Sequence, residues 1–153
     1  MKICITLISV ISLTIFTSTP AFAEDNGIIR IKSSYSVKNT IDKLEDVLKK
    51  KGMTVFKRVN HTAGATKVGL QLRPTELLIF GNPKVGTSLM LCSQTDALDL
   101  PQKALAYKDE RGQVWLVYND PAYIAKRHNI KGCEQPLQKI TAALAKFSKI
   151  ATE

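Results

Sequence analysis

The chain has 153 residues and a formal net charge of +9 at pH 7. That length suits one domain and excludes a second domain of ordinary size. The apolar share of 44% and the charged share of 23% are those of globular proteins, which excludes a wholly disordered chain.

The first 23 residues have the three parts of a secretory signal peptide. Lys2 supplies the positive charge, residues 3–16 are mainly apolar, and Ala21-Phe22-Ala23 has the small-x-small form of a cleavage site. We therefore expect a mature domain over residues 24–153 and a periplasmic or secreted location. A membrane anchor is the alternative, but the apolar stretch is short for a span.

The next segments predict two strands and two helices in alternation. Residues 28–32 form a β-type run, and Ser36 caps a helix to about residue 51, whose apolar residues recur at helical spacing. Residues 53–59 alternate as a second strand. Residues 62–72 predict a short helix tucked against the sheet, although their glycines weaken the prediction.

The stretch Arg73–Leu91 combines a polar edge with an apolar strand. Pro74 ends any preceding helix, and residues 75–80 predict a third strand. The run 77–80 is apolar on both faces, so either both faces are covered or one meets a second copy of the chain. Gly-Asn-Pro at 81–83 predicts a turn, and residues 84–93 fit either a loop or a short helix.

The last third predicts a hairpin followed by two helices. After a loop at 95–101, residues 102–108 and 113–119 predict strands joined by a four-residue turn. Asp120 and Pro121 are typical of a helix start, and a long helix covers residues 134–150. The whole order predicts an α+β fold, with one antiparallel sheet of about five strands and two long helices on one face.

The chain contains no familiar catalytic motif. A nucleophile elbow, an H-E-x-x-H pair, a P-loop and a C-x-x-C pair are all absent from the sequence, so we assign no catalytic residue, no cofactor and no metal. The dispersed lysines exclude nucleic acid as a partner and permit at most weak contact with a membrane surface. The two cysteines after the leader, Cys92 and Cys133, predict one disulfide in an exported protein, and two separate thiols are the alternative.

Four ordered motifs resemble one family. They are TKVGLQLRPTELLIFGNP from Thr66, G-T-x-L-M from Gly86, D-L-P-x-K from Asp99 and Y-N-D-P-x-Y from Tyr118. Together they resemble the domain-of-unknown-function family 302 over about residues 36–147. Ser88 departs from the pattern, since a proline is common there.

The resemblance implies a fold and a set of candidate residues, but no activity. The fold is a curved antiparallel sheet with helices on one side, of the TATA-binding-protein-like class, often in a dimer. Exported members often carry cysteines in the places of Cys92 and Cys133. The family's characteristic residues, which we take as candidate ligand-binding residues, are His61, Arg73, Glu76, Asn82, Lys103 and Asp120.

Three hypotheses for function follow. The first is a small exported binding or assembly domain without chemistry, which binds a small anionic or apolar ligand beside the 73–91 stretch and forms a homodimer through its sheet. The second is a periplasmic enzyme in which His61 or Glu76 is the base and Arg73 or Lys103 holds an anion. The third is metal or haem handling by soft ligands, drawn from Met90, Cys92, His128 and Cys133.

Overall fold

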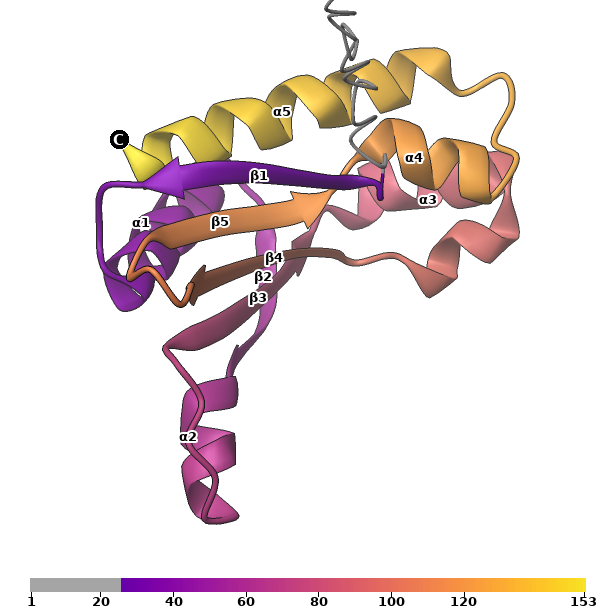
Figure 1. Ribbon diagram of the computed structural model, residues 1–153. Helices are drawn as coiled ribbons and strands as arrows, with labels where there is room; N and C mark the ends of the chain where they lie inside the picture. The colour runs from indigo at the N-terminus through magenta and orange to yellow at the C-terminus, as the bar shows by residue number, and fades with distance from the viewer. Residues whose placement is uncertain (1–25) are drawn as a thin grey trace, which may run out of the picture.

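The computed structural model describes residues 26–153 (Figure 1). The predicted signal peptide lies outside the described residues. The elements follow one another as β1 (Ile28–Ser33), α1 (Val37–Lys50), β2 (Thr54–Asn60), α2 (His61–Lys67), β3 (Thr75–Gly81), α3 (Pro83–Cys92), the 3-10 helix η1 (Gln94–Leu98), β4 (Gln102–Lys108), β5 (Val114–Asn119), α4 (Pro121–Arg127) and α5 (Glu134–Thr152).

The five strands form one sheet in the order β1-β5-β4-β3-β2, and every neighbouring pair is antiparallel. The predicted α+β class is therefore confirmed. The first strand, β1, pairs with the last strand, β5. In the β3–β4 pair, Thr75 lies opposite Tyr107 and Ile79 lies opposite Lys103, which places residues 73–75 and residues 80–83 at opposite ends of the sheet.

One face of the sheet is covered by α1 and α5, the two long helices that the apolar stripes predict. Their buried residues interlock with every second residue of the strands, and each fully buried Leu or Phe contributes roughly 1.5–3 kcal/mol. The core comprises Val37, Ile41, Leu44, Val47, Leu48, Leu78, Phe80, Ala104, Ala106, Val114, Leu116, Tyr118, Leu144, Phe147 and Ala151.

The alternate residues of the strands lie on the opposite face, and no described helix covers them there. Leu77, Ile79, Leu105 and Val117 are half-buried, whereas their strand neighbours are buried. The apolar run in β3 therefore has one covered face and one open face. Contact of this open face with a second copy of the chain stays a prediction.

The predicted helix at 62–72 is wrong in length and in position. Helix α2 begins at His61 and ends at Lys67, and Gly69, with a φ of +73°, reverses the chain after it. None of the α2 residues is buried, and α2 projects away from the sheet instead of packing against it (Figure 1). The segment has no continuous apolar face to bury, so nothing holds it against the core.

The stretch after β3 is a helix and not a loop. Asn82 caps α3 by accepting a hydrogen bond from the backbone N–H of Lys84 through its Oδ1 (3.0 Å), and Pro83 occupies the first turn. The expected loop at 95–101 contains the short η1. Asp120 caps α4 as predicted, with its Oδ1 accepting from Ala122 N at 2.9 Å.

Candidate functional site

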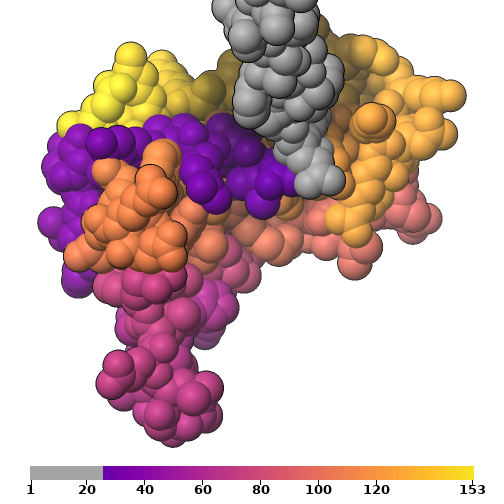
Figure 2. Space-filling model, in the orientation of Figure 1, coloured from indigo at the N-terminus to yellow at the C-terminus, as the bar shows by residue number. Residues whose placement is uncertain are grey.

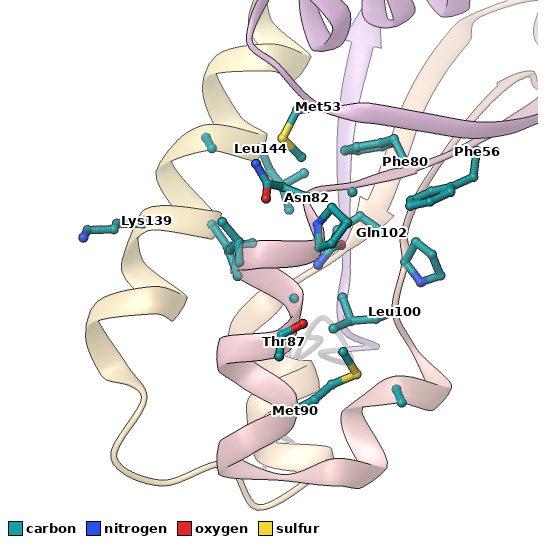
Figure 3. Close-up of a pocket in the computed structure, with 18 of the residues that line it drawn as sticks. Met53, Phe56, Phe80, Asn82, Thr87, Met90, Leu100, Gln102, Lys139 and Leu144 are labelled. Carbon is teal, nitrogen blue, oxygen red and sulfur yellow. The ribbon is translucent and has the colours of Figure 1, made fainter.

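A cavity of about 470 Å³ lies at the end of the sheet where β3 runs into α3. It lies between α3 and α5, with the segment from η1 to β4 forming a third wall (Figure 3). Protein interiors rarely leave voids larger than a water molecule, whereas small-molecule pockets occupy about 300–1,000 Å³. The volume of the cavity therefore lies within the range of small-molecule pockets.

The cavity walls are almost entirely apolar. Lys139 is the one charged residue of the described lining, and its side chain points away from the space (Figure 3). Phe56 and Val85 are exposed at the edge of the cavity, so the space reaches the protein surface. The lining comprises Met53, Phe56, Phe80, Gly81, Asn82, Pro83, Val85, Gly86, Thr87, Met90, Ala97, Leu100, Pro101, Gln102, Lys139, Ile140, Ala143, Leu144 and Phe147.

Small residues line this space on both of its helical walls. Gly86 on α3 and Ala143 on α5 line the cavity, and a larger side chain at either position would occupy it. Cys92 is the last residue of α3 and Cys133 precedes α5. Their Cα atoms are 6.4 Å apart, within the range that a disulfide allows, and the two sulfurs are placed as a pair. The predicted disulfide would thus fix the two helical walls relative to each other.

The structure places three of the six candidate residues at the opposite end of the sheet from the cavity. His61 is exposed at the start of α2. Arg73 is exposed, and its Nε donates to the carbonyl oxygen of Lys108 at 3.2 Å. Glu76 is buried and lines a smaller, more polar hollow of about 290 Å³ whose lining includes neither His61 nor Arg73.

Glu76 pairs with Arg58 and not with Arg73, which lies nearer to it in the sequence. Arg58 Nε donates to Glu76 Oε2 at 2.8 Å and Arg58 Nη2 donates to the same oxygen, while Asn60 Nδ2 donates to Oε1 at 3.1 Å. Arg58 also binds Asp42. Hydrogen bonds from Lys38 and then from Arg58 hold the pKa of Asp42 below its ordinary value. Both carboxylate oxygens of Glu76 therefore already accept hydrogen bonds from the protein, which gives Glu76 a structural role.

The other three candidate residues lie on separate elements. Asn82 lines the cavity, where its Oδ1 is already used to cap α3. Lys103 Nζ donates to the carbonyl oxygens of Asp99 at 2.8 Å and Pro101 at 3.0 Å, so it holds the turn that precedes β4. Asp120 caps α4. Of the six, Asn82 alone belongs to the lining of the cavity.

A partly buried polar cluster around His128 was not predicted from the sequence. His128 Nε2 lies 2.6 Å from Asp99 Oδ2, and its Nδ1 lies 3.1 Å from Thr95 Oγ1. Asp96 is completely buried beside this pair, and neither of its carboxylate oxygens has a hydrogen-bond partner among the described residues. Burial raises the pKa of Asp96, and the charge of His128 opposes that effect. The cluster ties η1 to the end of α4.

Two further findings concern residues 26–153. No group of three or more His, Cys, Asp and Glu side chains in that range is arranged to hold a metal ion. In the same range no helix combines the length and the apolar character that a bilayer span requires.

The sequence and the fold together define the family. The profile described as "Domain of unknown function DUF302" matches residues 29–147, so the chain belongs to the DUF302 family. The fold is similar to that of a solved structure, "Crystal structure of uncharacterized conserved protein DUF302 from Bacillus stearothermophilus". The TM-score is 0.74 at 20% identity, over 82% of this chain and 98% of that one.

The curated relatives are longer proteins. The chain is 51% identical over 106 residues to "Fluoride-specific ion channel FluC 1" of Brucella suis biovar 1 and of Brucella abortus biovar 1, and to "Fluoride-specific ion channel FluC 2" of Brucella melitensis biotype 1. The match covers 69% of this chain but 42% of the first relative and 39% of the other two. The chain therefore spans less than half the length of these relatives.

Proposed function

We propose that this protein is an exported binding domain that holds a small, mainly apolar ligand in the cavity between α3 and α5. The observation that carries the proposal is the combination of ligand-sized volume and apolar lining beside the 73–91 stretch. Of the two ligand classes that the sequence leaves open, anionic and apolar, the lining favours the apolar class. A charged group buried there would find few polar partners to replace its hydration.

Native mass spectrometry of the purified protein tests this proposal. We expect a bound species of fixed mass that is released by organic solvent. The variant Ala143→Phe fills the cavity, because residue 143 lines it, and should lose the bound species. Ala142→Phe is the matched control, since Ala142 is exposed on the same helix and lies outside the lining. Equal ligand occupancy in both variants would refute the cavity as the site.

The same proposal includes export from the cytoplasm, a disulfide between Cys92 and Cys133, and a homodimer. The three signal-peptide features in residues 1–23 support export. Export supports a disulfide between Cys92 and Cys133, because disulfides persist in oxidising compartments. The open apolar face around Leu77, Ile79 and Leu105 supports a homodimer through the sheet. Light scattering coupled to size exclusion should give a dimer for the wild type and a monomer for Ile79→Lys. A monomeric wild type at micromolar concentration would exclude this dimer.

A second candidate function is that of a partner domain for a fluoride channel. It is favoured by the 51% identity with part of proteins named as fluoride-specific ion channels, of which more than half lies outside the match. The test is fluoride efflux from vesicles that contain such a channel, with this domain added or omitted. A change in efflux rate would support the proposal, and an identical rate at saturating domain would refute it.

A further inference from the structure

A narrow arm, defined here as residues 61–74, projects from the base of β2 and β3 (Figure 2). It consists of α2, the reversal at Gly69 and the segment that returns to β3. Its base is fixed, because Asn60 Oδ1 accepts from Ala63 N at 2.8 Å and Thr62 Oγ1 accepts from Thr75 N at 2.8 Å. The arm is therefore a defined projection that contributes nothing to the buried core.

The arm exposes three apolar side chains within five residues. Val68 is 70% exposed, Leu70 is 65% exposed and Leu72 is 44% exposed. Single exposed apolar residues are ordinary on protein surfaces, but a group of three on one projecting arm indicates a contact surface.

Within the arm itself, the charged side chains of Lys67 and Arg73 are positive and there is no Asp or Glu. Lys67 and Arg73 bracket the three apolar residues in the sequence. Apolar side chains flanked by cations are the pattern that binds anionic lipid surfaces, because the apolar groups enter the interface while the cations contact the headgroups.

A second copy of the chain fits this arm less well than a membrane does. The three side chains expose roughly 300 Å² in total, whereas a stable protein interface takes about 800 Å² from each partner. Two arms brought together would also place like charges side by side. We infer that the arm docks this protein on an anionic lipid bilayer, with Val68, Leu70 and Leu72 in the interfacial region and Lys67 on the headgroups.

Vesicle co-sedimentation tests the inference. The purified protein is mixed with vesicles of phosphatidylcholine alone, or with roughly 30% phosphatidylglycerol added. We expect binding to the anionic vesicles, weakening as salt rises. The double variant L70S/L72S should reduce the partition coefficient by about tenfold or more, and Lys67→Ala by about fivefold. Leu91→Ser is the matched control, because Leu91 is 84% exposed on α3, outside the arm.

Circular dichroism shows whether each variant remains folded. We expect every variant to fold, because the substituted side chains are exposed. Equal binding to neutral and anionic vesicles would overturn the inference, as would wild-type binding by the folded L70S/L72S protein. An equal loss of binding in Leu91→Ser would also overturn it. If L70S/L72S instead turns a dimer into a monomer while vesicle binding is unchanged, the arm is a contact between copies and not a membrane anchor.

Discussion

The network around Glu76 gives the sharpest prediction about how the scaffold is held together. The change is Glu76→Gln, which keeps the volume of the side chain and one acceptor oxygen but removes the charge. The Glu76 side chain is 10% exposed and accepts two hydrogen bonds from Arg58 and one from Asn60. Breaking a buried charge pair costs about 3–5 kcal/mol.

Two features reduce that figure here. The Arg58 side chain is 29% exposed, and it keeps its ion pair with Asp42 after the substitution. We therefore expect a loss of about 2–3 kcal/mol in the free energy of unfolding, a large part of the 5–15 kcal/mol that a domain has in total. The control is Glu45→Gln. Glu45 lies 3.7 Å from Arg58 Nη1 and otherwise pairs with the exposed Lys49, so its loss should cost about 0.5 kcal/mol or less.

Urea unfolding followed by the fluorescence of Trp115, the single tryptophan, measures both variants. The urea concentration at the midpoint of unfolding should fall for Glu76→Gln, while the dependence of the free energy of unfolding on urea should be unchanged. Equal midpoints for the Glu76 and Glu45 variants would show that Glu76 is not held in the scaffold as described. Glu76 would then return as a candidate for ligand binding.

Two further predictions concern the polar cluster and the cross-link. Burial raises the pKa of Asp96, so the folded state binds a proton at this carboxyl more tightly than the unfolded state does. Ionisation of Asp96 therefore lowers the stability of the folded state as the pH rises above about 4. The stability of Asp96→Asn relative to wild type should therefore increase from about pH 4 to pH 7, and a difference independent of pH would contradict the placement of Asp96. For the cysteines, 41 residues apart in sequence, reduction should add two hydrogens to the mass and lower stability by about 4 kcal/mol. A native protein with two freely alkylated thiols would rule out the disulfide.

The sequence predicted the sheet and the two long helices because each has a simple periodic pattern. Helix α1 buries one apolar stripe, and the strands alternate or carry short apolar runs between clear turn residues. The error at 62–72 has a physical cause. Its Ala and Leu residues fall at helical spacing, but the positive φ at Gly69 ends the helix, and the remaining apolar residues face solvent.

The cavity could not be predicted, because its walls come from β2, β3, α3, α5 and the segment after η1. The sequence did not decide between a loop and a helix for the α3 segment, for a related reason. Leu89 is its one buried residue, whereas Val85 and Met90 line the cavity and so do not follow a buried stripe. Asp96 was missed because it lies in a segment that looked like an ordinary polar loop. Tertiary packing alone buries it beside His128.

The central claim is that a cavity of defined size binds an apolar ligand, and a chain-length series tests it most directly. Calorimetry would measure the affinity of alkyl alcohols of increasing length for the wild type, Ala143→Phe and Ala142→Phe. We predict a gain of about fourfold per methylene until the cavity is full, followed by a plateau. The plateau should begin at a shorter chain in Ala143→Phe and be unchanged in Ala142→Phe. Affinity that rises without a plateau, and equally in all three proteins, would show binding to an open surface and contradict the account.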